Sequence, residues 1–402
     1  MPESLMKIYT CALMPFEADA AFFARDSGLL CRALQALGGE SRVVMPARDG
    51  MDPPDVIRAN ADEFIDPTWW KSLGIDGVVF IAWGFAEHSP VIQAARAAGI
   101  RTCALFDCNG DPFPYADHFA KPRILWRKGK FIGNAAARFV GTGARVVLLA
   151  IKGIRAHYQR SVQMGIPHVA AFQTPKTMER CLHVARLFPW VEVRSMPLVL
   201  GYAIPEIPAV SEFLERRPNV VAVARWDALR HKRPQVLIRV VEMVLRRHAT
   251  VTFEVYGRLI PAIEQWHSQL DPELRARVSI QGVRPSREVM DSVGSSRILY
   301  CPSVEEGVPL PVVEALCAGC SVAGLGTPAV PGLYWAISQG DGTAAADDSI
   351  EAHAEAVLSE LKAWEERRRD PSKISQYWRR WFSSPEVARR VVELMSEPSV
   401  RI

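Results

Sequence analysis

Strand-like and helix-like segments alternate along almost the whole chain, and this alternation constrains the fold more than any other feature. Short apolar runs such as Asp76–Trp83 are typical of strands that are buried on both faces of a sheet. Segments with apolar residues at helical spacing, such as Ser27–Leu37, lie between these runs. The pattern predicts an α/β protein with mostly parallel sheets covered by helices.

The alternation falls into two series, which are separated by the proline-containing stretch Gly201–Val210. At 402 residues the chain exceeds what one hydrophobic core usually organises, so two domains are expected. The second series contains five strand candidates: Asn219–Trp226, Thr250–Arg258, Arg277–Val283, Ser296–Ser303 and Ser321–Gly326. Two doubly wound halves predict a cleft between them, with ligands bound at the carboxyl ends of the strands.

Composition restricts the class of protein further. Hydrophobic residues make up 49% and charged residues 23% of the chain, as in ordinary globular proteins, and the net charge of +4 gives no indication of a nucleic-acid partner. Cys317 and Cys320 have metal-ligand spacing, but no second pair completes a site, so we expect no metal. We see no signal peptide and no apolar run long enough to span a bilayer, and we therefore expect a cytoplasmic protein.

The segment Tyr300–Val322 is the most informative part of the chain. A buried strand ends near Pro302, a short loop follows, and a helix is expected to begin near Pro311. Gly307 allows the loop backbone to approach a ligand closely. The helix start would then present free N–H groups and its positive end to a diphosphate. Glu306 and Glu314 could both face one ligand, and carboxylates accept hydrogen bonds from pairs of sugar hydroxyls.

The run EEGVPLPVVEALCAG resembles the Glu-x7-Glu signature of retaining GT-B glycosyltransferases, particularly the large family numbered four. The resemblance extends over about Val220–Gly326. It implies a GT-B fold, in which two Rossmann-like doubly wound domains face a central cleft. Residues 1–204 would bind the acceptor and residues 205–374 the nucleotide-sugar donor. Residues 375–402 would return to the N-terminal domain, with Tyr377, Trp378, Trp381 and Phe382 as packing residues.

The resemblance also implies roles for individual residues on the donor side. Glu306 and the backbone amides of Gly307, Val308 and Leu310 would hold the donor sugar, and Glu314 would bind the ribose hydroxyls. The alternative is structural: Glu306 would cap the helix, and Glu314 would lie on a solvated face.

A cationic partner is needed for the departing diphosphate, because negative charge builds on it as the glycosidic bond breaks. The resemblance assigns this role to Arg225 and Lys232, although Arg230 or Arg233 could replace the lysine. A run of basic residues is otherwise a solvated surface. Val283 and Arg284 are expected to contact the nucleobase, and a plain strand-to-helix turn would explain that loop almost as well.

The N-terminal half departs from the pattern of the family. The first glycine after the first strand is Gly28, so Arg25, Asp26 and Ser27 are expected to supply polar contacts where relatives have a glycine-rich loop. Where many relatives carry a histidine, this chain has Asp107, which we expect to bind the acceptor, accept a proton or cap the following loop. His118 could substitute from a neighbouring loop.

The stretch Lys121–Arg160 contains ten basic residues and no Asp or Glu, with Trp126, Phe131 and Phe139 interleaved. Such a stretch is typical of contact with an anionic membrane surface or with a phosphate-bearing acceptor. A solvated helix followed by the buried run Val146–Ile151 is the simpler explanation. No nucleic-acid-binding motif accompanies the basic residues.

Together these observations predict a retaining glycosyltransferase that moves a sugar from a UDP- or GDP-linked donor to a glycan, lipid-linked or small-molecule acceptor. It would need no cofactor beyond the nucleotide sugar, and it would act in the cytoplasm or at the inner face of the membrane. Two alternatives remain open: another GT-B enzyme, either a nucleotide-sugar epimerase or a pseudo-glycosyltransferase, and a catalytically silent nucleotide-binding partner of another transferase.

Overall fold

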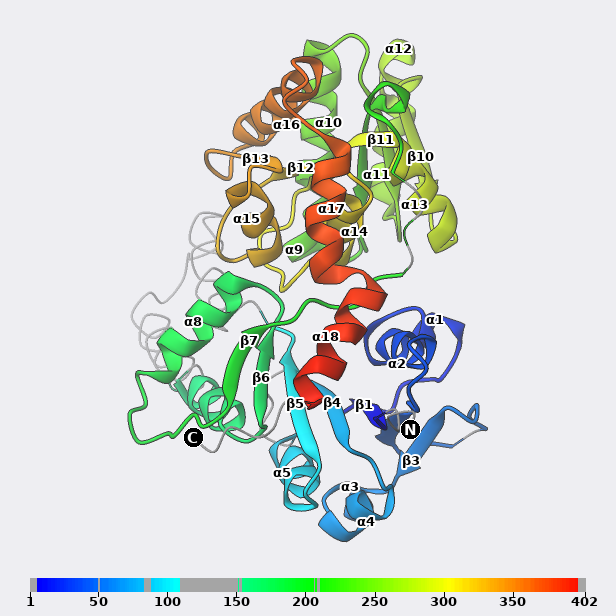
Figure 1. Cartoon of the computed structure of the whole chain (residues 1–402). Coiled ribbons are helices and arrows are strands. Elements are labelled where there is room, and N and C mark those ends of the chain that lie inside the picture. Colours follow the sequence, from blue (N-terminus) through cyan, green and yellow to red (C-terminus); the bar gives the residue numbers. More distant parts are fainter. Residues whose placement is uncertain are drawn as a thin grey trace, which may run out of the picture.

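The computed structural model describes residues 6–49, 51–82, 88–108, 151, 154–205, 207 and 210–396. These residues form two lobes, and each lobe is a parallel sheet covered by helices (Figure 1). The prediction of two Rossmann-like domains is confirmed.

The N-terminal lobe contains a seven-stranded parallel sheet with the order β3-β2-β1-β4-β5-β6-β7. Its strands are β1 (Ile8–Ala12), β2 (Val43–Pro46), β3 (Val56–Ala59), β4 (Gly77–Ala82), β5 (Arg101–Phe106), β6 (Val169–Phe172) and β7 (Met196–Val199). Its helices include α1 (Ala20–Phe23), α2 (Asp26–Ala36), α3 (Ala61–Phe64), α4 (Pro67–Ser72), α5 (Ser89–Ala97) and α8 (Pro175–Ala185). Successive strands are added in opposite directions from β1 and β4, so the topological switch point of this sheet lies between those two strands.

The C-terminal lobe contains a six-stranded parallel sheet with the order β10-β9-β8-β11-β12-β13. Its strands are β8 (Arg217–Val223), β9 (Thr252–Tyr256), β10 (Val278–Gly282), β11 (Ser296–Cys301), β12 (Ser321–Gly324) and β13 (Gly342–Ala344). Its helices include α9 (Leu229–Lys232), α10 (Pro234–Arg247), α11 (Pro261–Gln269), α12 (Pro272–Arg275), α13 (Ser286–Ser295), α14 (Leu310–Cys317), α15 (Pro331–Ser338) and α16 (Ile350–Glu365). Here the switch point lies between β8 and β11.

Two final helices connect the lobes. Helix α17 (Pro371–Phe382) packs on α14, and its Trp378 and Phe382 belong to the core of the C-terminal lobe. Helix α18 (Ser384–Ser396) packs on α2 of the N-terminal lobe. The chain therefore crosses between the lobes at Ser383 and not at Ser375, because the aromatic side chains of α17 are buried in the C-terminal lobe.

The crossing runs beside the linker between the two sheets. The amide of Ile204 donates to the carbonyl of Phe382 at 3.0 Å, and Ile204 and Ser383 form a parallel bridge. A Cβ on Gly201 would lie 2.3 Å from the carbonyl oxygen of Trp381, so this linker position requires glycine. The linker between the sheets and the junction between α17 and α18 thus pass side by side, and both connect the two lobes.

Candidate active site

The loops that follow β8 and β11 meet at the switch point of the C-terminal sheet. Arg225 follows β8, and the loop continues into the short helix α9, which ends at Lys232. The side chain of Lys232 forms an ion pair with Glu306, which lies in the loop after β11. The two side chains are only 13% and 16% exposed, so this pair is shielded from solvent. The structure therefore brings together two of the residues predicted from sequence.

Backbone hydrogen bonds hold the β11 loop in place. The amide of Val304 donates to the carbonyl of His231, in the β8 loop, at 3.2 Å, and the amide of Glu306 donates to the carbonyl of Ala329, in the loop after β12, at 3.1 Å. Burial lowers the pKa of His231, and the positive charges of Lys232, Arg225 and Arg230 lower it further, whereas Glu306 raises it. Arg225 itself is exposed.

Of the two neighbouring residues Lys232 and Arg233, Lys232 is the one that pairs with Glu306. Arg233 has a left-handed backbone (φ 53°) and forms an ion pair with Asp348, away from Glu306. Arg230 contributes to the positive potential at His231. The alternative that Arg233 takes the place of the lysine is therefore not supported by the geometry.

Helix α14 begins at Leu310, one residue earlier than expected, with Pro311 in its first turn. Its N-cap is Pro309 and has no side-chain cap, so Glu306 does not cap the helix. The amides of Gly307, Val308 and Leu310 make no hydrogen bond within the part of the chain that the structure describes. Free amides and the positive end of a helix form a site for an anion.

Glu314 is the fifth residue of α14, in the second turn of that helix. Its side chain is partly buried and not on a solvated face, and burial raises its pKa from 4.5 to about 7. No hydrogen bond or ion pair to this carboxylate is found within the described residues. A carboxylate without a counter-charge in such a position is available to accept hydrogen bonds from a ligand.

The N-terminal lobe approaches the same loop from the other side. A Cβ built on Gly307 would lie 3.1 Å from Oδ1 of Asp107 and 3.3 Å from Oε1 of Gln173. Asp107 follows β5 and Gln173 follows β6, and the amide of Gln173 donates to Oδ1 of Asp107 at 3.1 Å. Glycine at position 307 therefore allows the lobes to meet closely, and Asp107 lies beside the loop that carries Glu306.

Two residues of this cluster were missed by the sequence analysis. Gln173 is fully buried, and Tyr202, in the linker, is 5% exposed. Burial raises the pKa of Tyr202 well above its ordinary value, and the negative charges of Asp107 and then Asp26 add to this effect. The signal that could have located Gln173 is its position directly after the apolar run of β6, a strand that the sequence analysis did not assign.

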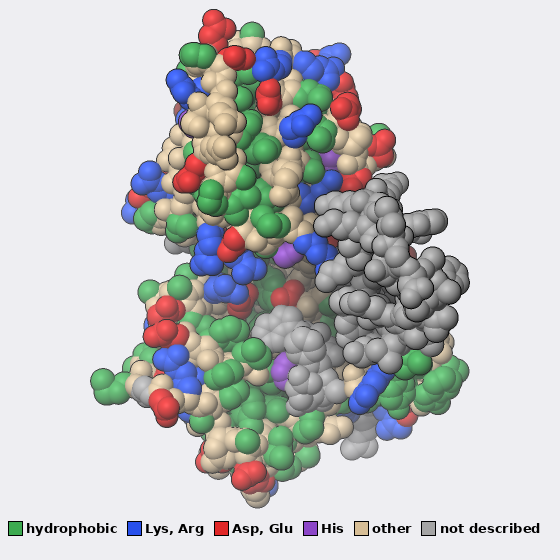
Figure 2. Space-filling model, turned by 180° about the vertical axis from the view of Figure 1, so that it is seen from behind, with side chains coloured by type: hydrophobic (Ala, Val, Ile, Leu, Met, Phe, Trp, Pro, Cys, Tyr) green, Lys and Arg blue, Asp and Glu red, His purple; other side chains and the backbone are tan. Residues whose placement is uncertain are grey.

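The lobes also touch beside this cluster. Arg180 of α8 donates to the carbonyl of Pro328, and the ammonium group of Lys176 lies 5.9 Å from the ring centre of Tyr334 in α15. Seen from behind, the molecule is hollowed between its two lobes, with basic side chains along the upper margin (Figure 2).

The remaining predicted residues are not gathered in this way. Val283 and Arg284 follow β10, two strands away from β8, and Val283 is 75% exposed. Their contact with a nucleobase stays a prediction. His118 and most of the stretch 121–160 lie outside the described residues.

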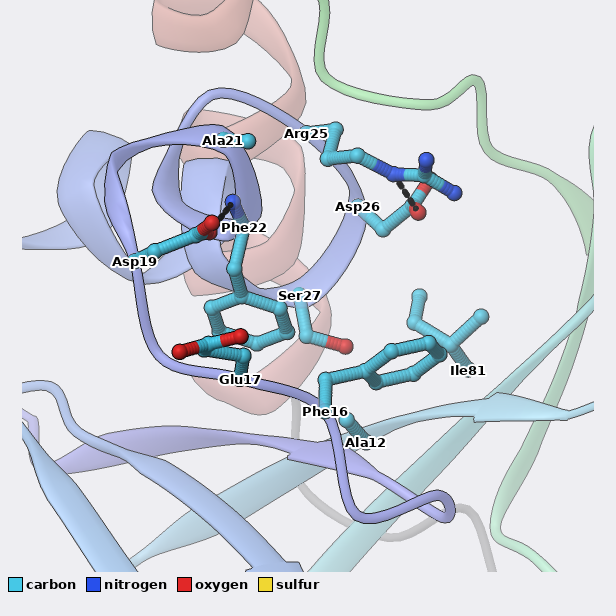
Figure 3. Close-up of a pocket in the computed structure, with 10 residues that line it drawn as sticks. All are labelled: Ala12, Phe16, Glu17, Asp19, Ala21, Phe22, Arg25, Asp26, Ser27 and Ile81. Carbon is cyan, nitrogen blue, oxygen red and sulfur yellow. Dashed lines mark hydrogen bonds and ion pairs between the residues drawn. The ribbon is translucent and has the colours of Figure 1, made fainter. Parts of the chain in front are cut away.

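Arg25, Asp26 and Ser27 line a cavity of about 230 Å³ in the N-terminal lobe (Figure 3).

In the part of the chain that is described, no group of three or more acidic, histidine or cysteine side chains is arranged to hold a metal ion. No described helix is both long and apolar enough to cross a membrane.

Comparison with known proteins adds a family match over part of the chain and a fold. Residues 217–362 match the family described as Glycosyl transferases group 1. This range spans β8 to α16 and so includes Arg225, Lys232, Glu306 and Glu314. No curated protein matched the chain by sequence.

Solved structures that share the architecture cover both lobes. Sucrose-phosphate synthase from Thermosynechococcus elongatus is 14% identical, with a TM-score of 0.56 over 96% of this chain and 98% of that chain. HepE from Anabaena, solved with UDP and glucose, is 11% identical, with a TM-score of 0.59 over 98% of this chain and 100% of its own. WaaG, a glycosyltransferase involved in lipopolysaccharide biosynthesis, is 14% identical, with a TM-score of 0.53 over 97% of this chain and 100% of its own. At these identities the likeness establishes the fold.

Proposed function

We propose that this GT-B glycosyltransferase, whose C-terminal lobe carries a glycosyl transferases group 1 domain, moves a sugar from a nucleoside diphosphate donor to an acceptor with retention of anomeric configuration. The observation that carries the proposal is the shielded Lys232–Glu306 ion pair at the β8–β11 switch point. Its position, next to the uncapped start of α14, fits a ligand with a diphosphate at one end and a sugar at the other.

The two partners of the ion pair would take separate roles when the donor binds. Glu306 would turn to the sugar hydroxyls, and Lys232 would join Arg225 at the diphosphate. The positive charge that these cations supply would stabilise the negative charge of the leaving group as the glycosidic bond breaks. The free amides of Gly307, Val308 and Leu310 would hold the donor without any cost of reorganisation.

Glu314 would bind the ribose. Its carboxylate is partly buried and has no charged partner among the described residues, which is unfavourable until hydroxyl donors arrive. We propose a uracil nucleotide as the first candidate, because HepE, which has the same fold, was solved with UDP. A guanine nucleotide is the second candidate.

Donor binding is tested by thermal unfolding in the presence of UDP, GDP, ADP, CMP and dTDP. A ligand at one hundred times its dissociation constant stabilises the folded state by about 2.7 kcal/mol, which is readily measured. We expect one nucleotide to stand out, and the response to be lost in Glu306→Gln and kept in Glu264→Gln, whose side chain is exposed on α11. An equal response to every nucleotide, or none, would refute the donor site.

Turnover is tested by incubating the protein with the sugar conjugates of the nucleotide that binds. Release of the free nucleotide with a glycosylated acceptor supports transfer, and NMR of the product's anomeric proton tests retention. An isomerised nucleotide sugar would identify an epimerase. If the nucleotide binds but no donor is consumed, the protein is a silent partner of another transferase.

Exposed apolar side chains support the proposal that the N-terminal lobe contacts a membrane. They are more than a third exposed and come from the helical segment at 154–164, from residue 151, which precedes it, and from the loop after α8: Ile151, Ile154, Tyr158, Leu187 and Trp190. Phe188 joins two of them, because its ring centre is 5.7 Å from that of Tyr158 and 5.8 Å from that of Trp190.

The exposed side chains of Arg155 and Arg186 lie in the same segments as these apolar residues, whereas Arg194 is paired with Glu192. Aromatic rings beside arginines are typical of the interface of an anionic bilayer. We expect the protein to float with vesicles of phosphatidylcholine and phosphatidylglycerol but not with phosphatidylcholine alone. Trp190→Ser should weaken flotation, and Leu214→Ser, 81% exposed on the other lobe, should not. Equal flotation of the two variants would contradict the assignment.

A further inference from the structure

Two cysteines of the N-terminal lobe lie against each other behind the candidate active site. The sulfur of Cys108, in the segment after β5, is 3.8 Å from the sulfur of Cys181, in the second half of α8. The two residues are far apart in the chain, so the tertiary fold brings them together. A disulfide has a bond length of roughly 2.05 Å, so the sulfurs need to approach by about 1.8 Å more to form one.

The two thiols differ in their access to solvent. All eight cysteines of the chain lie among the described residues, and seven of them are buried, whereas Cys108 is partly exposed. Cys181 is 2% exposed and belongs to the hydrophobic core of the lobe. A reagent in solution therefore meets Cys108 first, and Cys181 is placed to react with the sulfur beside it.

The protonation of Cys181 leads to the same order of reaction. Its hydrogen bond with Cys108 raises the pKa of the Cys181 thiol well above its usual range, burial raises it further, and the positive charge of Arg160 lowers it. Cys181 thus keeps its proton at neutral pH. Because the thiolate is the nucleophile in thiol chemistry, the first attack on an oxidant comes from Cys108.

The residue before each cysteine touches the other lobe. Asp107 lies beside Gly307 in the loop after β11, where a Cβ would be 3.1 Å from its Oδ1. Arg180 donates to the carbonyl of Pro328, and its helix α8 packs on α15 of the C-terminal lobe (Figure 1). The thiol pair therefore lies directly behind two contacts between the lobes.

A bond between the two sulfurs would move at least one of these contacts. Strand β5 is paired with β4 on one side and with β6 on the other, which holds the strand itself in place. The approach of the sulfurs then falls on the segment Asp107–Cys108 or on α8. Movement of the segment changes how Asp107 meets Gly307, and movement of the helix changes how Arg180 meets the C-terminal lobe.

We propose that Cys108 and Cys181 are a modification site, at which a low-molecular-weight disulfide such as oxidised glutathione forms a reversible bond between α8 and the end of β5. The thiolate of Cys108 attacks one sulfur of the oxidant, and one glutathione thiolate leaves. The sulfur of Cys181 then attacks Cys108 in this mixed disulfide, and its proton passes to the second glutathione as that group leaves. The two cysteines lose two electrons, and the oxidant is reduced to two thiols.

The bond would loosen the contact between the lobes. We expect the backbone amides of 303–310 to exchange hydrogen faster in the oxidised protein, because Asp107 no longer packs against this loop in the same way. We also expect slower turnover, an effect that rests on the proposed transfer function. Reduction of the bond restores both properties.

The test is incubation of the full chain with excess oxidised glutathione at pH 8, followed by thiol titration in denaturant and peptide mapping. We expect the thiol count to fall by two from the eight of the reduced chain, with Cys108 joined to Cys181 and no glutathione attached. Dithiothreitol should restore all eight. Cys108→Ser and Cys181→Ala should abolish the linkage, whereas Cys103→Ala, a buried position on β5, should keep it.

Hydrogen exchange and turnover are measured on the same reduced and oxidised samples, and thermal unfolding shows whether each variant is folded. Oxidation should speed exchange at 303–310 at least twofold and lower turnover at least fivefold in the natural protein and in Cys103→Ala, but not in Cys108→Ser.

Eight remaining thiols, glutathione retained on Cys108, or a bond between other cysteines would overturn the site. A complete Cys108–Cys181 bond with unchanged exchange at 303–310 would overturn its effect on the lobes. Absence of turnover in the reduced natural protein refutes the proposed transfer function alone, because peptide mapping and hydrogen exchange do not depend on activity.

Discussion

The partly buried carboxylate of Glu314 leads to a prediction that couples stability to donor binding. Burial raises its pKa from 4.5 to about 7 in the folded protein. Below pH 4.5 the group is protonated in both the folded and the unfolded state, and it does not affect the free energy of unfolding. As the pH rises toward 7, the unfolded chain loses the proton and the folded protein keeps it, so the folded state becomes relatively less stable.

The size of the effect follows from the pKa. The pKa of Glu314 differs by about 2.5 between the folded and the unfolded state. At about 1.36 kcal/mol for each pKa unit, this difference lowers the free energy of unfolding by about 3 kcal/mol above pH 7. This value is an upper limit, because the side chain retains some contact with solvent. Glu314→Gln removes the titration, so we expect the variant to be up to about 3 kcal/mol more stable than the natural protein at pH 8 and unchanged at pH 4.5.

The same substitution should weaken donor binding. A carboxylate that accepts hydrogen bonds from two ribose hydroxyls contributes about 1.5–3 kcal/mol for each charged bond, so loss of one such bond raises the dissociation constant for the nucleotide roughly 10- to 100-fold. Nucleotide affinity of the natural protein should also fall as the pH drops below 7, whereas that of the variant should not.

The assays are urea unfolding at pH 4.5 and pH 8 and calorimetric titration with the nucleotide that stabilises the protein. Glu264→Gln is the matched control, because Glu264 is exposed in the same lobe. If the free energy of unfolding differs between Glu314→Gln and the natural protein by the same amount at pH 4.5 and pH 8, the carboxylate is not buried as the structure indicates. If it is stabilised but binds the nucleotide normally, Glu314 does not contact the ribose.

Three further substitutions test neighbouring contacts. Lys232→Gln should lower kcat about 100- to 1000-fold, as expected for loss of a group that stabilises a developing charge. Arg233→Gln should leave kcat within twofold, because Arg233 pairs with Asp348. Similar kcat values for the two variants would contradict the assignment. Gly307→Ala should lower kcat/KM more than tenfold, because its methyl group would lie 3.1 Å from Asp107, and a fully active variant would show that the lobes do not meet there. Arg216→Leu should destabilise the C-terminal lobe by roughly 2–6 kcal/mol in urea unfolding, since the buried carbonyls of Ser296 and Ala318 would each lose a donor; a change below 1 kcal/mol would argue against those bonds.

Much of the architecture is encoded locally and was therefore predictable. Strands buried on both faces of a sheet appear in the sequence as short apolar runs. All five strands predicted in the second half are found as β8 to β12, with small shifts at their ends. The spacing of Glu306 and Glu314 and the glycine between them also come directly from the order of residues. The strands β3, β6, β7 and β13, of three or four residues each, were not assigned.

Other features depend on contacts between segments that are far apart in the chain. Three cations follow one another in Arg-His-Lys-Arg, and only the packing of the β8 and β11 loops makes Lys232 the partner of Glu306 and directs Arg233 to Asp348. Likewise, Asp107, Gln173 and Tyr202 lie on three separate segments, and they meet because parallel strands end at one edge of the sheet.

The sequence by itself thus determined two doubly wound halves, a glycine-containing loop between two glutamates, and a set of candidate cations, because propensity, periodicity and spacing are properties of neighbouring residues. Only the tertiary structure decided which cation pairs with the glutamate, on which lobe each final helix packs, and that Glu314 is partly buried with no counter-charge among the residues that the structure describes. Burial and pairing depend on which distant side chains fill the surrounding space, and that information is absent from any local stretch of the chain.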